Sequence, residues 1–251
     1  MITGMPRIAI AMHDFDAAVE TFRGELGMPV VDLTPGSVES LGAKLAMCVP
    51  EGGSNIELMS PANPEAPLSQ SLSRFLERRG EGLFALMLEA PDPDEEALRL
   101  LDRGLNVLPT MAGASGRDVH PNSTHGVLIR VYPVNSFAGE TSASRSGLSG
   151  IIRAMVAVRD LDHARTVYET GFGLACDAPC DDGARGVRGF VCRPPSGGVI
   201  EFVTPSDADR PFAREVAAFL EDRDGLYALV LRGNERQSVT VCGARIIVEN
   251  S

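Results

Sequence analysis

The chain has 251 residues, of which 44% are hydrophobic and 23% charged, as in a globular protein with one large domain or two small ones. Its formal net charge of −11 comes from acidic residues spread along the chain, which argues against a nucleic-acid partner because phosphate binding needs clustered lysine and arginine. No apolar run approaches the ~20 residues of a membrane helix and no signal peptide is evident, so we expect a cytoplasmic protein with no membrane partner. The five cysteines form no CxxC pair, and we expect them to be reduced thiols.

The first part of the chain follows the order strand, helix, strand, strand. Asp14 is suited to cap the helix, apolar residues follow it at helical spacing, and Gly27 ends it. A proline and glycine turn around residues 34–36 separates the helix from the last two strands. The expected elements of this first module cover residues 7–12, 15–26, 43–49 and 55–59.

The second module repeats this order. A short amphipathic piece from Arg74 breaks at Gly80 and Gly82 before its first strand. Asp92 is suited to cap the helix, with Pro93 at the first helical position. The expected elements are a strand, a helix and two strands over 83–89, 93–103, 105–108 and 127–132, and the glycine-rich residues 113–117 are expected to form a mobile loop over the functional site.

Much of this sequence pattern is repeated in the second half of the chain. The motif FLERRGEGLFAL at 75–86 is answered by FLEDRDGLYAL at 219–229, and residues 153–205 repeat the pattern of the first module. A fourth module has only residues 232–237 where a helix would be needed, so it is abridged. The serine- and glycine-rich residues 136–150 are typical of a linker.

Four such units in two pairs resemble the vicinal oxygen chelate superfamily, which includes glyoxalase I, extradiol dioxygenases, bleomycin-resistance proteins and methylmalonyl-CoA epimerase. The first half is most similar to the epimerases, in DFDAAVETFRGELG at 14–27, FLERRGEGL at 75–83 and HPNSTHGVLI at 120–129. The resemblance implies an α+β fold of glyoxalase-like paired βαββ modules, four modules in two halves with the fourth abridged. We expect a first domain over residues 1–135, a linker over 136–150 and a second domain over 151–251.

In metal-dependent members of this family, the ligands stand at fixed strand positions inside a cup that two modules form. Carried over by position, they fall on Arg7, Glu57, Ala85 and Arg130 in the first half, and on Arg153, Glu201, Ala228 and Ile247 in the second. A guanidinium repels a cation and alanine has no ligand atom, so only the glutamates could bind a metal. We therefore expect no metal and no cofactor in either cup.

What replaces the ligands suggests a different chemistry. Arg7 and Arg130 would place two fixed positive charges in the first cup, suited to a carboxylate, an enolate or a phosphate, and Glu57 could act as a general base. With one spare positive charge in the cup, the change Arg130→Leu is expected to leave the free protein as stable or more so. The alternative is an internal ion pair between Arg7 and Glu57 in a vestigial cup. The recurrence of that pair as Arg153 and Glu201 favours the alternative.

Two further residues are candidates for this site. His125, just before the last strand of the second module, is either a proton donor at the rim of the cup or a turn histidine that bonds a nearby carbonyl. Glu39 lies about one residue away from where the epimerases keep a second catalytic glutamate. It is either a substrate-binding residue or a glutamate in a loop.

The resemblance implies a metal-independent isomerase or lyase that acts through an enolate on a small anionic carbonyl or acyl-thioester substrate. Two alternatives stay open, a protein that sequesters a small molecule as bleomycin-resistance proteins do, and a metal-dependent glyoxalase or dioxygenase relative. Because the fourth module is abridged, we expect the first cup to be the deeper and working one. The expected partner is a small anionic ligand, and the expected state is a monomer or a homodimer.

Overall fold

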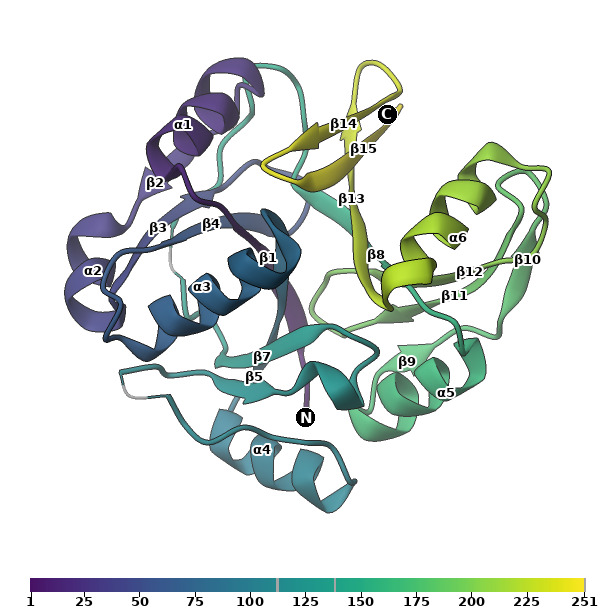
Figure 1. Cartoon of the computed structure of the whole chain (residues 1–251), viewed down its shortest axis with the longest axis horizontal. Helices are drawn as coiled ribbons and strands as arrows, with labels where there is room; N and C mark the ends of the chain where they lie inside the picture. Colours follow the sequence, from purple (N-terminus) through teal and green to yellow (C-terminus); the bar gives the residue numbers. More distant parts are fainter. Residues whose placement is uncertain (112, 138, 251) are drawn as a thin grey trace.

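Two curved sheets, each curled around one helix, make up the molecule (Figure 1). The computed structural model describes residues 1–111, 113–137 and 139–250. The first sheet is formed by strands between residues 4 and 133, and the second by strands between residues 151 and 250. Helices and strands are mixed along the chain, as in the α+β class. Among the described residues, no helix is both long and apolar enough to span a membrane.

The first sheet has the strand order β2-β3-β4-β1-β5-β7-β6. Its strands are β1 (Gly4–Ala11), β2 (Val30–Asp32), β3 (Ala43–Cys48), β4 (Asn55–Pro61), β5 (Gly82–Ala90), β6 (Arg117–Val119) and β7 (Leu128–Pro133). β1 runs parallel to β4 and antiparallel to β5, and β5 runs parallel to β7. The two modules of the first half therefore meet along β1 and β5.

The second sheet repeats this arrangement, with the order β10-β11-β12-β8-β13-β15-β14 and with β9 beside β11. Its strands are β8 (Ile151–Ala157), β9 (Ala175–Cys176), β10 (Cys180–Asp182), β11 (Val187–Arg193), β12 (Ile200–Pro205), β13 (Gly225–Gly233), β14 (Gln237–Val241) and β15 (Ala244–Asn250). β8 is parallel to β12 and antiparallel to β13. Only residues 234–236 separate β13 from β14, so the fourth module is abridged as the sequence predicts.

The helices cover both sides of the sheets. They are α1 (Phe15–Glu20), α2 (Thr34–Leu41), α3 (Pro67–Arg79), α4 (Pro93–Asp102), α5 (Leu161–Thr166) and α6 (Pro211–Asp222), and π-helical segments extend α1 over Thr21–Glu25 and α5 over Val167–Gly171. Asp14 and Asp92 cap their helices as predicted, the Asp14 carboxylate accepting a hydrogen bond from the Ala17 backbone nitrogen at 3.0 Å. α3 and α6 each lie on the inner face of a sheet (Figure 1).

One apolar core joins the two halves. It contains residues from the outer face of both sheets and from the helices against them, among them Ile8, Phe22, Val156 and Phe172. The inner faces have separate cores, one under α3 and one under α6. Burial of these faces is the main favourable contribution to folding, and the shared core fixes the two halves against each other.

Three local predictions are wrong. Residues 34–36, expected as a turn, begin helix α2, which Pro35 favours because its fixed φ suits a first helical turn. Residues 105–108 form no strand and contribute one isolated bridge, from Val107 to Val119. The strand beside β7 is instead β6, which begins at Arg117, the last residue of the expected loop at 113–117.

The segment between the sheets is held on the first half. The Arg145 backbone nitrogen donates to the Gly27 carbonyl at 2.8 Å, and the Ser146 hydroxyl donates to the Leu26 carbonyl at 2.6 Å. These bonds attach residues 144–146 to the end of the first helical segment. The domain boundaries at residues 135 and 150 stay a prediction.

The prediction of five reduced cysteines is wrong for two of them. Cys176 and Cys192 face each other in the register of β9 and β11 and form a disulfide. Cys48 is buried, Cys180 is exposed and Cys242 is half-buried, and these three are free thiols. This pairing could not be predicted from the sequence, because the two cysteines are 16 positions apart and only the strand register brings them together.

Candidate functional site

The first cup is the side of the first sheet that faces α3. Leu68, Leu72 and Leu76 of the helix pack there against small and apolar residues of the strands, such as Ala9 and Ala85. The small strand residues let the helix approach the sheet closely, and the helix fills much of the space that the sheet encloses.

Arg7 and Glu57 form a buried ion pair in this cup. The Arg7 Nε atom donates to Glu57 Oε2 at 2.9 Å, and Arg7 Nη1 donates to the Ser136 hydroxyl at 3.1 Å. Arg7 is 5% exposed and Glu57 4%, and the guanidinium lies 4.5 Å from the ring centre of Tyr132. Burial by itself lowers the pKa of Arg7 and is the largest single effect, but the charge of Glu57, the Tyr132 hydroxyl and the hydrogen bonds to both together raise the pKa overall. The Arg7 guanidinium is therefore charged and held in one geometry.

Arg130 has a carboxylate of its own, which the sequence analysis did not identify. Its Nε and Nη2 atoms donate to the two oxygens of Asp118 at 2.8 and 3.0 Å, and Arg130 is 4% exposed. Such a two-pronged contact is a strong form of charge pairing. The expectation of a spare positive charge in the first cup is wrong, because Asp118 lies on β6, a strand that the sequence analysis placed elsewhere.

The metal of the family does not fit the first cup. Arg7 and Arg130 stand at two of the four ligand positions with their nitrogens already donating to carboxylates, and Ala85 has no donor atom. The strand register places Ala9 beside both Glu57 and Ala85. Within residues 1–111, 113–137 and 139–250, no group of three or more His, Cys, Asp and Glu side chains is placed to hold a metal ion.

The open space beside the first cup lies away from this polar centre. A cavity of about 360 Å³ is lined by Phe84 and Leu128 of the sheet and by Arg74 and Arg78 of α3, but not by Arg7, Glu57 or Arg130. Phe84, whose ring centre lies 5.8 Å from the Arg130 guanidinium, stands between that charge and the cavity. The catalytic role proposed for Glu57 and the binding role proposed for Arg7 stay predictions.

The second cup, the side of the second sheet that faces α6, repeats the ion pair and extends it. Arg153 Nε lies 2.7 Å from Glu201 Oε2, and Arg153 Nη2 donates to Glu249 at 2.6 Å. Arg185 donates to the other oxygen of Glu201 at 2.5 Å and to Asp182 at 2.7 Å. Burial lowers the pKa of Arg185, but its bonds to the two carboxylates raise it overall.

This cup also holds an open cavity, of about 410 Å³. Its apolar wall includes Met155 and Ile247, and Ile247 occupies the position of Arg130: it pairs with β13 where Arg130 pairs with β5. With an uncharged side chain at that position, Ile247 makes no counterpart of the Arg130–Asp118 ion pair of the first cup. The expectation that the first cup is the deeper one is not supported, since the larger of these two cavities lies in the second.

The charged wall of the second cavity carries more positive than negative charge. Arg185, Arg236, Arg245 and Glu249 line it. Arg245 pairs with Glu215 outside the cavity, and Glu249 pairs with Arg153. No hydrogen bond or ion pair joins the exposed Arg236 to any residue in the described part of the chain. None of these four was a candidate from the sequence, because none stands at a position carried over from the family's metal ligands.

The structure places the other two candidates apart from the buried charges of the first cup. His125 has a positive φ of 53° and lies where the two halves meet, with Nδ1 3.0 Å from Asp224 and Nε2 2.9 Å from Nδ1 of His163. Neither of these contacts is the carbonyl expected for a turn histidine. Glu39 is exposed on α2, and a helix replaces the loop expected there. Their functional roles stay predictions.

Comparison with known proteins shows what the chain resembles. Residues 7–120 match the model of the glyoxalase/bleomycin resistance protein/dioxygenase superfamily. A search of curated proteins found no match. A triple mutant of 4-hydroxymandelate synthase from Streptomyces coelicolor is 14% identical, covers 93% of this chain and 72% of its own, and superposes with a TM-score of 0.65, which shows a shared fold.

Two solved epimerase structures are more similar in sequence over a shorter stretch. Methylmalonyl-CoA epimerase in complex with methylmalonyl-CoA and NH4+ is 26% identical, covers 57% of this chain and 100% of its own, and has a TM-score of 0.45. Methylmalonyl-CoA epimerase from Mycobacterium tuberculosis is 28% identical, covers 53% of this chain and 89% of its own, and has a TM-score of 0.44.

Proposed function

We propose that the protein binds a small organic anion in its second cup without a metal, because residues 7–120 match the model of the glyoxalase/bleomycin resistance protein/dioxygenase superfamily and the second sheet repeats the first. The observation that supports this most is the cavity of about 410 Å³ with three arginines in its wall. Its volume is in the usual range for small-molecule sites. Arginine suits a carboxylate or an enolate because its planar group donates in two parallel directions.

The wall of this cavity has an apolar part and a charged part, so it suits a ligand with an apolar part and a charged part. Met155, Phe212 and Ile247 offer an apolar surface, and Arg236 and Arg245 offer charge. A small carboxylic acid with an apolar or aryl group would cover both surfaces. The ligand class is therefore an organic carboxylate or an anionic carbonyl compound, as the resemblance implied for the first cup.

The test is a thermal-shift and calorimetry series with benzoate and 2-oxobutyrate on the wild type, Arg236→Gln and Arg188→Gln. Arg188 is the matched control, since it is an exposed arginine of the same sheet that pairs with Asp181 and does not line the cavity. We expect stabilisation by at least one of the two acids in the wild type and in Arg188→Gln, through the coupling of binding to folding, and a loss in Arg236→Gln. Equal responses in the two variants, or none in the wild type, would contradict the proposal.

A catalytic form of this proposal rests on Glu249. Its carboxylate lines the same cavity as the arginines, so a base and a set of positive charges that could stabilise an enolate face one space. This arrangement would suit a metal-independent isomerase or lyase. NMR can follow the exchange of the C3 hydrogens of 2-oxobutyrate with deuterium. An exchange rate above the uncatalysed rate would show catalysis. Glu249→Gln should keep binding and lose exchange, and binding without exchange in the wild type would favour sequestration.

A further inference from the structure

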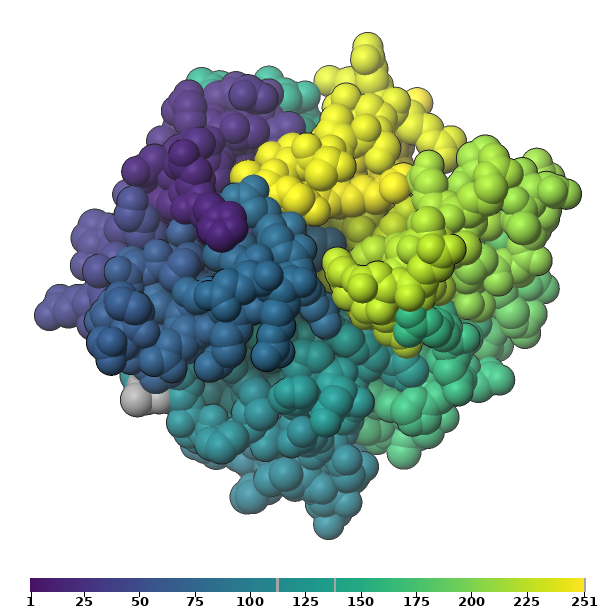
Figure 2. Space-filling view, in the orientation of Figure 1, coloured from purple at the N-terminus to yellow at the C-terminus, as the bar shows by residue number. Residues whose placement is uncertain are grey.

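A third cavity, of about 250 Å³, lies where the two halves of the chain meet. The ends of α3 and α6 and the hairpin of β14 and β15 surround it, and Figure 2 shows the surface hollowed between these three segments. We call it the junction cavity. It is distinct from the cavity of the second cup, although Arg245 lines both.

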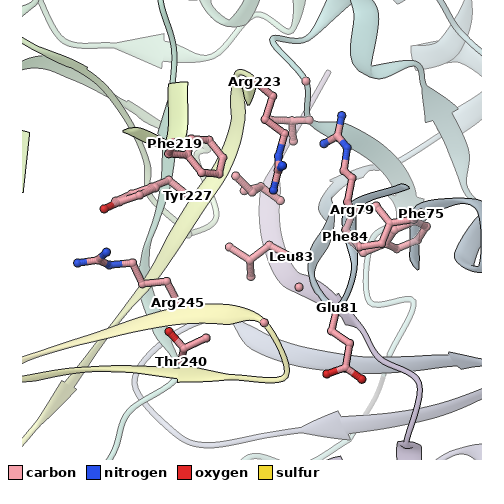
Figure 3. Close-up of a pocket in the computed structure, with 15 residues that line it drawn as sticks. Phe75, Arg79, Glu81, Leu83, Phe84, Phe219, Arg223, Tyr227, Thr240 and Arg245 are labelled. Atoms are coloured by element: carbon pink, nitrogen blue, oxygen red, sulfur yellow. The ribbon is translucent and has the colours of Figure 1, made fainter. Parts of the chain in front are cut away.

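The lining of the junction cavity comes from the two copies of the repeated motif. The first copy contributes Phe75, Arg79, Leu83 and Phe84, and the second contributes the corresponding Phe219, Arg223, Leu226 and Tyr227. In Figure 3, Phe75 and Phe84 of the first copy lie on one side of the cavity and Phe219 and Tyr227 of the second copy on the other. The site is thus built from equivalent residues and needs both halves of the chain.

The two equivalent arginines bring like charges together. Figure 3 shows Arg79 and Arg223 at the same end of the cavity. Burial lowers the pKa of Arg79, and the charge of Arg223 lowers it further. Arg223 pairs with Asp222, whose side chain is 73% exposed and therefore well screened. Among the described residues, the Arg79 side chain makes no hydrogen bond or ion pair, and the charge of Asp222 only partly offsets the effect of burial and of Arg223.

The other charged groups of the lining point elsewhere. The Glu81 carboxylate accepts a hydrogen bond from the His13 backbone nitrogen at 2.8 Å, and the Arg245 guanidinium pairs with Glu215. In Figure 3 both charged ends lie away from Arg79 and Arg223. The end of the cavity between those two arginines therefore carries positive charge that its own walls do not balance.

Aromatic rings form the two sides of the cavity, and smaller residues such as Val127 and Thr240 complete its wall. Phe75 and Phe84 meet edge to face with ring centres 5.2 Å apart, and Phe219 and Tyr227 do the same at 5.3 Å. Leu83 lies between these two pairs in Figure 3. The cavity thus combines two guanidinium groups at one end with apolar rings on both sides.

We propose that the junction cavity is a binding site for an organic monophosphate, with the phosphate between Arg79 and Arg223 and an aryl or other apolar group among the rings of Phe75, Phe84 and Phe219. A phosphate monoester carries close to two negative charges and has oxygens for two guanidinium groups, so it offsets both arginines at once. A single carboxylate would offset only one.

Calorimetric titration of phenyl phosphate tests this, with inorganic phosphate as the ligand without an apolar part. We expect the wild type to bind one phenyl phosphate per chain. Its affinity should fall roughly tenfold or more in Arg79→Gln and in Arg223→Gln. Arg78→Gln is the matched control, because Arg78 is the adjacent exposed arginine of α3 and does not line the junction cavity. Inorganic phosphate should bind more weakly than phenyl phosphate.

Three results would overturn the site. They are no binding to the wild type, the same loss in Arg78→Gln as in Arg79→Gln, and equal affinity for phenyl phosphate and inorganic phosphate. Arg236→Gln separates this site from the second cup, since Arg236 lines only the latter of these two cavities. Binding that Arg236→Gln removes and Arg223→Gln leaves intact would also reject the junction site, without affecting the proposal for the second cup.

Discussion

Arg185 Nη2 lies 2.5 Å from Glu201 Oε1, so the buried carboxylate of the second cup is shared between two arginines. In the first cup, Glu57 is paired with Arg7. The added guanidinium of Arg185 also lines the cavity of the second cup, so one side chain both neutralises Glu201 and contributes to the charged wall. Glu201 is therefore committed to the structure of the cup, and the arginines at its edge are the groups that a ligand can reach.

We expect that the stability of the protein depends on both members of the Arg7–Glu57 ion pair being present together. Glu57→Gln leaves the Arg7 guanidinium buried without a counter-ion and should lower the free energy of unfolding by about 3–5 kcal/mol. The double change of Arg7 and Glu57 to methionine should recover most of that loss, because no unpaired charge remains. Urea unfolding of the three proteins measures both effects. A loss below about 1 kcal/mol in Glu57→Gln would show that the pair is well solvated.

Arg130→Leu is now expected to destabilise the protein, against the expectation from sequence. The change leaves Asp118, whose side chain is 13% exposed, without the two hydrogen bonds that satisfy it. Breaking such a pair should cost about 3 kcal/mol, whereas Arg188→Leu, which breaks an exposed pair, should cost at most about 1 kcal/mol. Equal midpoints of urea unfolding in the two variants would restore the earlier view of an unpaired Arg130.

Two glycines let the halves approach each other backbone to backbone. A methyl group at Gly126 would overlap the Asp224 carbonyl, and one at Gly243 would overlap the Glu81 carbonyl; both glycines have positive φ, at 77° and 67°. Gly126→Ala should lower the free energy of unfolding by about 2 kcal/mol or more. Gly183→Ala is the control, since nothing lies within 4 Å of its added carbon, and it should change stability by less than about 1 kcal/mol. Similar unfolding midpoints for the two variants would mean that the backbone segments between the two halves can move apart at little cost in stability.

The cysteines should differ in reactivity. At pH 8, iodoacetamide should label the exposed Cys180 first and Cys242 slowly, because burial, with the charges of Glu81 and Asp14, raises the pKa of Cys242 to about 11. Labelling of Cys242 should rise roughly tenfold from pH 8 to pH 9, as its thiolate fraction does. Cys176 and Cys192 should be labelled only after reduction. Mass spectrometry that finds Cys192 labelled without a reductant would contradict the disulfide.

The repeat in the sequence predicted the fold because each half is made of the same local signals. Asp14 and Asp160 cap equivalent helices, and the strands before them, β1 and β8, are largely apolar and buried as expected. The site was harder to predict, because its partners come from segments with weak local patterns. Asp118 lies on a strand of three residues, and Arg236 precedes a short hairpin strand. Which of two similar cups stays open depends on packing, such as Ile247 in the place of Arg130.

The most direct test of the account is where a small carboxylate binds. A crystal soaked with 4-bromobenzoate should show an anomalous bromine peak in the second cup, against Phe212 and Ile247, with the carboxylate within hydrogen-bonding distance of Arg236 or Arg245. A peak only beside Phe84 and Leu128 at the first cup, or only in the junction cavity, would contradict the assignment of the second cup as the anion site.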